Sequence, residues 1–230
     1  MSGVQLRQAR KARGWTQSDL AQRVCVSQGY VSLLEHGARR VPRRLANKFV
    51  SALGLPPSAL PLSLKAEPLA ADRLTAALAS LGYPGFAYMR WKKKFNPAEL
   101  VVRALRCKTL DARVVEALPW LLVKYPDLDW DWLLRETKLH DLQNRLGFVV
   151  TVARELAART GDPAGAKKLA EVERELTNSR LQKEDAFASD TLTEAERRWL
   201  RSHRPPEAAY WNVLTNMTAE TLADVTRPVT

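Results

Sequence analysis

Residues 16–37 read TQSDLAQRV-C-VSQGYVSLLEHG, and their capping residues and apolar spacing predict the fold of the N-terminal part of the chain. Thr16 can cap a helix by accepting a hydrogen bond from a free amide of its first turn. Asp19 completes a capping box near the positive end of the helix dipole. The apolar residues that follow recur at helical spacing and form a stripe for a core: Leu20, Ala21 and Val24. The pattern predicts a short helix that begins after Thr16.

A second short helix is predicted after a tight turn. Ser27 can cap it in the same way, and Val31 with Leu34 supplies an inward apolar face. Gly37 ends it, because glycine adopts the left-handed conformation at a helix end without steric cost. Cys25 lies between the two helices, where we expect a small buried hydrophobic side chain.

Spacing, caps and apolar pattern together match a known family. The matching positions are Thr16-Gln17, Ala21, Val26-Ser27-Gln28, Ser32 and Glu35-His36-Gly37. On these residues the segment 3–60 resembles the Cro/CI-type (XRE-family) helix-turn-helix domain, with residues 4–13 and 42–53 as its first and fourth helices. The resemblance covers about a quarter of the chain. It implies a four-helix or five-helix domain that binds double-stranded operator DNA as a homodimer.

The resemblance also implies which residues contact DNA. Gln28, at the start of the second helix of the motif, would contact a base edge, and its amide can pair bidentately with adenine. Gly29, Tyr30 and Ser32 would line the same face. Gln17 lies at a helix N-terminus, where it can meet a phosphate. The expected phosphate contacts are Arg10, Arg39, Arg40, Arg43 and Arg44.

Two positions depart from the family pattern. Gly29 stands where the family often has a larger polar residue, and it has no side chain that could contact a base. Leu33 stands where the family often has a second polar contact, and it offers only an apolar surface for a thymine methyl group or the core. Base recognition is therefore expected to depend on few residues.

Charge supports a nucleic-acid partner independently of the motif. Residues 1–64 carry ten Lys and Arg against two acidic residues, which is +8 of the formal net charge of +11. Binding to phosphates with counterion release requires such a local excess of cations. The cationic field therefore belongs to the N-terminal domain.

Composition limits the classes of protein to which the chain can belong. Hydrophobic residues make up 46% of the 230 residues, which is typical of a folded globular chain. No run of about 18 apolar residues and no signal-peptide pattern occurs, so we expect a cytoplasmic protein with no membrane partner. Cys25 and Cys107 have no metal or redox spacing, and no motif indicates a metal or another cofactor.

Prolines mark the domain boundary. Pro56, Pro57, Pro61 and Pro68 interrupt helical geometry, because proline lacks the amide hydrogen and restricts the residue before it. We place the DNA-binding domain at residues 1–60, a linker at 61–68 and a larger domain at 69–230. This larger domain has no alternating strand pattern, and the whole chain is predicted to be all-α.

Apolar spacing and capping residues predict the helices of the larger domain. They are 70–81, 97–105, one that starts at Asp111 and is kinked at Pro119, a long one over 130–160, 163–180, 194–202 and 206–217. In the long helix, His140, Asp141, Gln143, Asn144 and Arg145 would form a polar face.

Two clusters in the larger domain resemble binding motifs. Asp127, Asp129 and Asp131 open like a calcium loop, but Trp132 replaces its glycine, which favours acidic residues at a helix N-terminus instead. The run WKKKF, residues 91–95, mixes cations and aromatics as single-strand binders do, although a solvated turn explains it as well.

Arg135 and His140, with four residues between them, leave an enzymatic alternative open. Helical ribonucleases of the HEPN type carry such an arrangement, in which a cation holds the phosphate while the imidazole moves a proton. The pattern is weak, since Arg198 and His203 show the same spacing. We expect a protein without enzymatic activity and keep a HEPN-like ribonuclease as the alternative.

A second resemblance concerns the larger domain. Ala87-Tyr88-Met89, the run 115–121 and the run 139–146 are similar to bacterial regulators that accompany nucleotidyltransferase-type toxins. The resemblance implies a helical interaction and dimerisation domain that neutralises a cognate toxin, as an antitoxin does. Together the two resemblances predict a sequence-specific transcriptional repressor.

Overall fold

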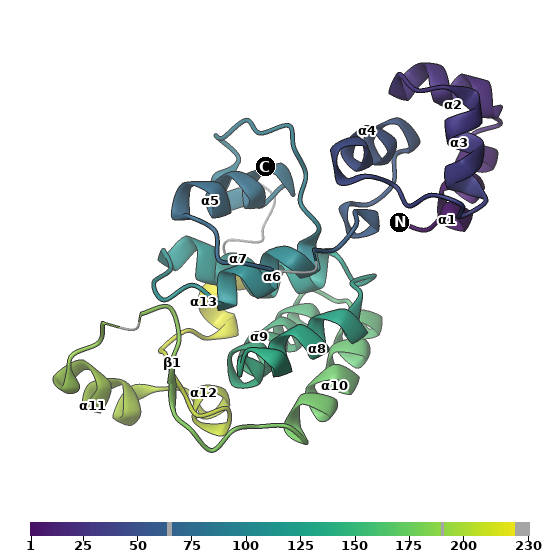
Figure 1. The fold of residues 1–230 in the computed structure, drawn as a ribbon. Helices are drawn as coiled ribbons and strands as arrows, with labels where there is room; N and C mark the ends of the chain where they lie inside the picture. The colour runs from purple at the N-terminus through teal and green to yellow at the C-terminus, as the bar shows by residue number, and fades with distance from the viewer. Residues whose placement is uncertain (64–65, 190, 224–230) are drawn as a thin grey trace. The chain divides into compact units, whose positions relative to one another are not determined.

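The computed structural model describes residues 1–63, 66–189 and 191–223 (Figure 1). Helices make up nearly all of its regular structure, which confirms the predicted all-α class. The described residues form two compact units: residues 1–63 with 93–96, and residues 66–92 with 97–189 and 191–223.

The first unit contains four helices and a short 3-10 turn. They are α1 (Gly3–Ala12), α2 (Gln17–Val24), α3 (Gln28–Glu35), α4 (Arg43–Leu53) and the turn η1 (Pro57–Ala59). Each helix contributes to one core, whose fully buried side chains include Leu6, Leu20, Val24, Val31, Leu34 and Phe49. Burying side chains of this size stabilises a fold by roughly 1.5–3 kcal/mol each. The apolar stripes predicted for residues 16–37 therefore form the centre of this unit.

The predicted caps of the motif are confirmed. Thr16 accepts from the amide of Asp19, and the Asp19 carboxylate accepts from the amide of Thr16 at 2.8 Å. Ser27 Oγ accepts from the Tyr30 amide at 3.2 Å. The prediction of a buried Cys25 is wrong: this residue ends α2 in the left-handed conformation, with φ of 59°, and its side chain is exposed. The tight turn that redirects the chain into α3 therefore places its side chain in solvent.

A segment from far along the chain packs in the first unit. The amide of Lys94 donates to Asn47 Oδ1 of α4 at 2.9 Å. The side-chain amide of Asn96 donates to the carbonyls of Ser58 and Leu60 at 2.9 and 2.7 Å, and Asn96 is only 4% exposed. The prolines at 61–68 predict a domain boundary but not this return of the chain to the first unit. The local sequence of 93–96 does not indicate that these residues contact α4 and residues 58–60.

The second unit holds the remaining elements. Its helices are α5 (Ala71–Ser80), α6 (Pro97–Leu105), α7 (Ala112–Lys124), α8 (Trp130–Leu139), α9 (Gln143–Arg159), α10 (Pro163–Thr177), α11 (Glu194–His203), α12 (Pro206–Tyr210) and α13 (Ala219–Ala223), with a 3-10 turn η2 (Pro84–Phe86). The buried α9 packs against α7, α8, α10, α12 and α13 and forms the centre of this unit (Figure 1).

The single long helix predicted over residues 130–160 is wrong. The helix breaks at His140, and Asp141 adopts the left-handed conformation with φ of 54° before α9 begins at Gln143. Of the five residues predicted to form a polar face of this helix, Gln143 and Asn144 are buried, whereas Asp141 is exposed and His140 and Arg145 are half-buried. The apolar residues keep a spacing of three and four through residues 139–146, so the sequence pattern did not indicate a break there.

The last predicted helix is shorter than expected. Helix α12 ends at Tyr210, and residues 213–214 form the short strand β2 (Val213–Leu214), which pairs in parallel with β1 (Asp185–Ala186). Between the end of α12 and the start of β2, the indole of Trp211 is fully buried and donates from Nε1 to Thr151 Oγ1 of α9 at 2.8 Å. A tertiary contact therefore replaces helical continuation here.

The described part of the chain offers no metal cluster and no membrane span. No group of three or more His, Cys, Asp or Glu side chains in it could hold a metal ion. None of its helices has the length and apolar character that crossing a bilayer requires. In the run 127–131, which opens like a calcium loop, Asp129 caps α8 by accepting from the amide of Trp132 at 3.0 Å. This is the helix-terminus role that the sequence favours.

Candidate nucleic-acid interface

Helix α3 presents one face to the core and another to solvent. Val31 and Leu34 are buried, while Gln28 and Gly29 are exposed in its first turn. Ser32 is half-buried, and Leu33 is 42% exposed, so its side chain lies on the outer face and not in the core. The helix therefore displays a short exposed surface that starts at its capped N-terminus.

A chain of hydrogen bonds connects this surface to the interior. Gln28 Nε2 donates to Gln17 Oε1 at 2.7 Å, and Gln17 Nε2 donates to Glu35 Oε2 at 2.9 Å. Glu35 also accepts from Arg10, whose Nε lies 2.6 Å from Oε1 and whose Nη2 lies 2.8 Å from Oε2. The position of the exposed Gln28 amide is therefore determined by a buried ion pair.

Arg10 is not placed to contact a phosphate. Its guanidinium forms an ion pair with Glu35 and donates to the carbonyl of Trp15, and the residue is only 8% exposed. The expected phosphate contact is thus a structural ion pair between α1 and α3. Sequence reasoning missed Glu35 as its partner, although a glutamate beside the buried positions Val31 and Leu34 was a signal that a cation must neutralise it.

The ion pair determines the protonation of Glu35. Burial by itself raises the pKa of this carboxyl, but hydrogen bonds from Arg10 and Gln17 and the charges of Arg10 and Arg7 outweigh burial. The pKa of Glu35 therefore lies below its ordinary value, and the network is ionised at neutral pH.

The Gln28 amide keeps the hydrogen-bonding groups that recognition of adenine requires. A glutamine amide has two N–H donors and one carbonyl acceptor, and the bond to Gln17 occupies one donor. A second N–H and the exposed carbonyl oxygen remain. One donor and one acceptor are what the major-groove edge of adenine pairs with.

The remaining predicted residues surround this face. Tyr30 is half-buried against the core, and the guanidinium of Arg39 lies 6.0 Å from the centre of its ring. Arg40 and Arg44 are exposed. Arg43 is exposed as well, and its guanidinium donates to Ser63 Oγ at 3.1 Å and to the carbonyl of Pro61 at 3.3 Å.

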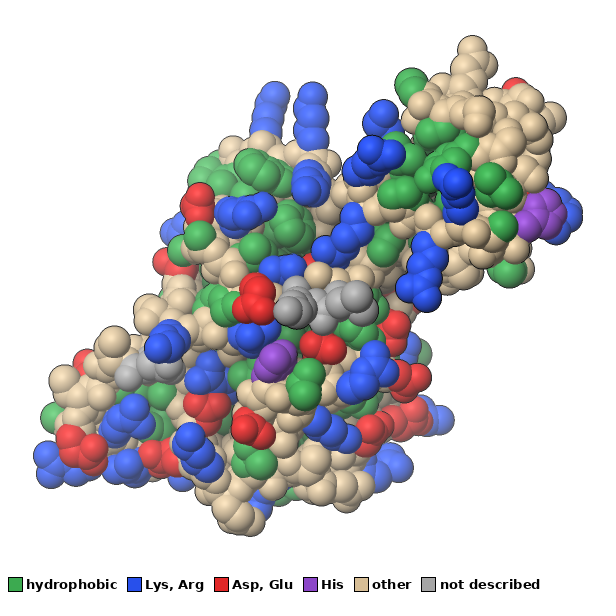
Figure 2. Space-filling view, viewed as in Figure 1, with side chains coloured by type: hydrophobic (Ala, Val, Ile, Leu, Met, Phe, Trp, Pro, Cys, Tyr) green, Lys and Arg blue, Asp and Glu red, His purple; other side chains and the backbone are tan. Residues whose placement is uncertain are grey.

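The cations of the first unit are mostly at its surface. Figure 2 shows Lys and Arg side chains spread over the visible face of this unit. Arg13 and Arg23 both lie over the ring of Trp15, at 5.3 and 4.2 Å from its centre. The returning segment adds Lys93 and Lys94. Of the two acidic residues in positions 1–64, Glu35 is neutralised internally, so the outward field is strongly positive.

Comparison with known proteins agrees with this geometry. A family model described as a helix-turn-helix domain matches residues 3–62, which include the segment 3–60 that resembles the Cro/CI type. No curated protein and no solved structure matches the chain. Residues 3–62 therefore form a helix-turn-helix domain of the Cro/CI-like, XRE type, the DNA-binding domain of a transcriptional regulator.

Proposed function

We propose that the protein is a sequence-specific repressor that inserts the N-terminus of α3 into the major groove of operator DNA. The observation that supports this proposal most is the hydrogen-bonded chain from Glu35 through Gln17 to Gln28. It holds an exposed amide in one position and leaves it a donor and an acceptor. Preorganisation of this kind favours recognition, because less side-chain freedom is lost on binding.

Phosphate contacts set the register of α3 on the duplex in this proposal. Arg39 and Arg40 lie between α3 and α4, Arg43 and Arg44 lie in the first turn of α4, and all four are exposed. Such contacts position a protein without specifying sequence. Tyr30 and Ser32 would supply the remaining contacts on the face of α3. At Gln17, whose side chain is engaged with Glu35 and Gln28, the backbone amides of the α2 N-terminus would supply the phosphate contact.

We further propose that the protein acts as a homodimer. Dimers of domains of this type bind two half-sites about one helical turn apart, and each copy places one helix in the major groove. A single α3 displays few polar side chains that can contact bases, so two copies are needed for high specificity. The second unit is the part of the chain that we assign to dimerisation and to partner binding.

The second unit is proposed as a binding module without catalysis. His140 lines a cavity of this unit, whereas Arg135, its partner in the ribonuclease alternative, is exposed and does not line it. Neutralisation of a nucleotidyltransferase-type toxin stays a prediction from the sequence resemblance. RNA cleavage that is lost in His140→Ala would support the ribonuclease instead.

Selection of binding sites tests the proposed function. The full chain would be used to enrich duplexes from a randomised pool, followed by footprinting and a reporter placed behind the enriched site. We expect a palindromic sequence, protection of two half-sites about one turn apart, and lower reporter expression when the protein is present. Enrichment without any consensus would contradict sequence-specific binding, and unchanged expression would contradict repression.

A further inference from the structure

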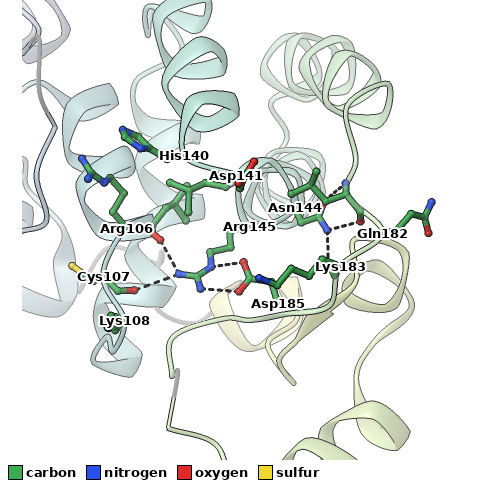
Figure 3. A pocket seen from close by; sticks show the side chains of 13 residues that line it. Arg106, Cys107, Lys108, His140, Asp141, Asn144, Arg145, Gln182, Lys183 and Asp185 are labelled. Atoms are coloured by element: carbon green, nitrogen blue, oxygen red, sulfur yellow. Dashed lines mark hydrogen bonds and ion pairs between the residues drawn. The ribbon is translucent and has the colours of Figure 1, made fainter.

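Three segments of the second unit line a cavity of about 640 Å³ that is partly open to solvent. They are the end of α6 with the residues after it (105–108), the connection between α8 and α9 with the first turn of α9 (140–145), and the chain between α10 and β1 (181–185) (Figure 3). Nothing in the DNA-binding proposal uses this cavity. Its volume lies within the range of about 300–1,000 Å³ that small-molecule sites occupy.

Two side chains of α9 hold the three segments together. Arg145 forms a bidentate ion pair with Asp185, at 2.6 and 2.7 Å, and donates from Nη1 to the carbonyls of Leu105 and Cys107 at 2.8 and 3.3 Å. Asn144 donates to the carbonyl of Leu181 at 2.9 Å and accepts from its amide at 2.8 Å. Figure 3 shows Arg145 between the segment that carries Cys107 and Asp185. The walls are therefore fixed before any ligand binds.

The charges along the walls are unequal. Asp185 is neutralised by Arg145, which leaves Asp141 as the other carboxylate among the lining residues. The lining residues also include the cations Arg106, Lys108 and Lys183, together with His140. Among the described residues, no carboxylate forms an ion pair with Lys108 or Lys183. Arg106 donates from Nη1 to the carbonyl of Ala66 at 2.6 Å, and its Nη2 lies 3.4 Å from the carboxylate of the exposed Glu67. The cavity therefore has a surplus of positive charge.

We infer that this cavity binds a small organic anion, whose phosphate or carboxylate group lies against Lys108, Lys183 and Arg106. The apolar side chains of Leu105, Leu142 and Leu181 line the same space and would contact the organic part. An anion gains most where several cations converge on a preformed, partly enclosed site. The inference does not depend on the DNA contacts of α3.

Titration calorimetry on the full chain tests the inference. The probes are adenosine 5′-monophosphate for the phosphate form and citrate for the carboxylate form, with sodium sulfate at matched ionic strength as a measure of general charge attraction. We expect saturable binding of one equivalent of at least one organic probe, with sulfate much weaker. Absence of saturable binding for both organic probes would overturn the inference.

Matched variants locate the binding site. Lys108→Ala with Lys183→Ala removes two cavity cations, whereas Lys124→Ala with Lys167→Ala removes two exposed lysines of the same unit outside the cavity. Arg43→Ala with Arg44→Ala removes charge from the DNA-binding unit, which also attracts anions. We expect the dissociation constant to rise at least tenfold in the first pair only. Equal effects in all three pairs, or loss of binding in the arginine pair alone, would refute the cavity site.

Discussion

At the scale of single residues, Glu35 connects stability with recognition. Its carboxylate accepts hydrogen bonds from Arg10 and Gln17, and Gln17 in turn accepts from Gln28. Its side chain is fully buried and that of Arg10 is 9% exposed. Breaking a buried pair by removing one charge is costly, because the other charge stays buried without its partner.

Glu35→Gln should therefore destabilise the first unit by about 3 kcal/mol or more. Amide hydrogen exchange of α1 and α3 measures this loss, because it reports the opening of one unit of a two-unit chain. Asp19→Asn is the matched control, since Asp19 is exposed and makes only local capping bonds. A loss for Glu35→Gln no larger than that of the control would contradict the role of the buried pair.

The ion pair also predicts acid sensitivity. The pKa of Glu35 is lower in the folded chain than the ordinary 4.5, because the bonds from Arg10 and Gln17 outweigh the effect of burial. A carboxyl with a lowered folded pKa contributes stability above its unfolded pKa and loses it as the pH falls through the folded value. The stability difference between wild type and Glu35→Gln should thus be constant well above pH 4.5 and shrink below it. A difference that stays unchanged down to acid unfolding would contradict this assignment.

At the scale of elements, the packing of α9 on the segment after α12 depends on one glycine. A Cβ built on Gly147 would lie 2.4 Å from ring atoms of Trp211, whose indole is fully buried. Gly147→Ala should destabilise the second unit by about 1–3 kcal/mol through overpacking, although alanine favours the helix by up to about 1 kcal/mol. Denaturant unfolding followed by tryptophan fluorescence measures the change.

Gly29→Ala is the matched control for that experiment. Gly29 is also helical, but no atom lies within 4 Å of a Cβ built on it. The substitution should therefore leave stability unchanged or raise it by about 0.5–1 kcal/mol. Equal effects of the two substitutions would show that the Trp211 contact does not restrict position 147.

Local signals explain which elements the sequence predicted. The caps of α2 and α3 lie within three residues of their partners, so Thr16, Asp19 and Ser27 could be interpreted without knowledge of the fold. The break between α8 and α9 could not, because Asn144 and Arg145 bond to residues about 40 positions away. The same is true of α12, whose end is set by the burial of Trp211 against α9.

At the scale of the whole molecule, the charge distribution assigns nucleic-acid binding to one unit. Residues 1–64 carry +8 of the net +11, and the family match covers residues 3–62. The sequence could predict this division, since charge and prolines are visible in it. It could not predict that Lys93–Asn96 packs in the first unit, because the hydrogen-bond partners Asn47, Ser58 and Leu60 are distant in the sequence and come close only in the folded chain.

Phosphate contacts predict a specific salt dependence. Arg44→Ala should weaken binding to operator and random duplexes equally and lower the slope of log K against log salt by about 0.9. Binding measured at several salt concentrations checks this expectation. Lys124→Ala, an exposed cation of the second unit, is the control and should leave the slope unchanged. An unchanged slope for Arg44→Ala would remove that residue from the phosphate contacts.

The DNA sequence preference of Gln28→Ala shows whether Gln28 recognises a base. Dissociation constants would be measured for the selected operator, for its single-base variants and for random DNA, with the exposed Gln22→Ala as the matched control. We predict a loss of about 1–3 kcal/mol on the operator, relaxed discrimination at one base position of each half-site, and little change on random DNA. An equal loss on operator and random duplexes, or an unchanged preference at every position, would show that Gln28 does not recognise a base.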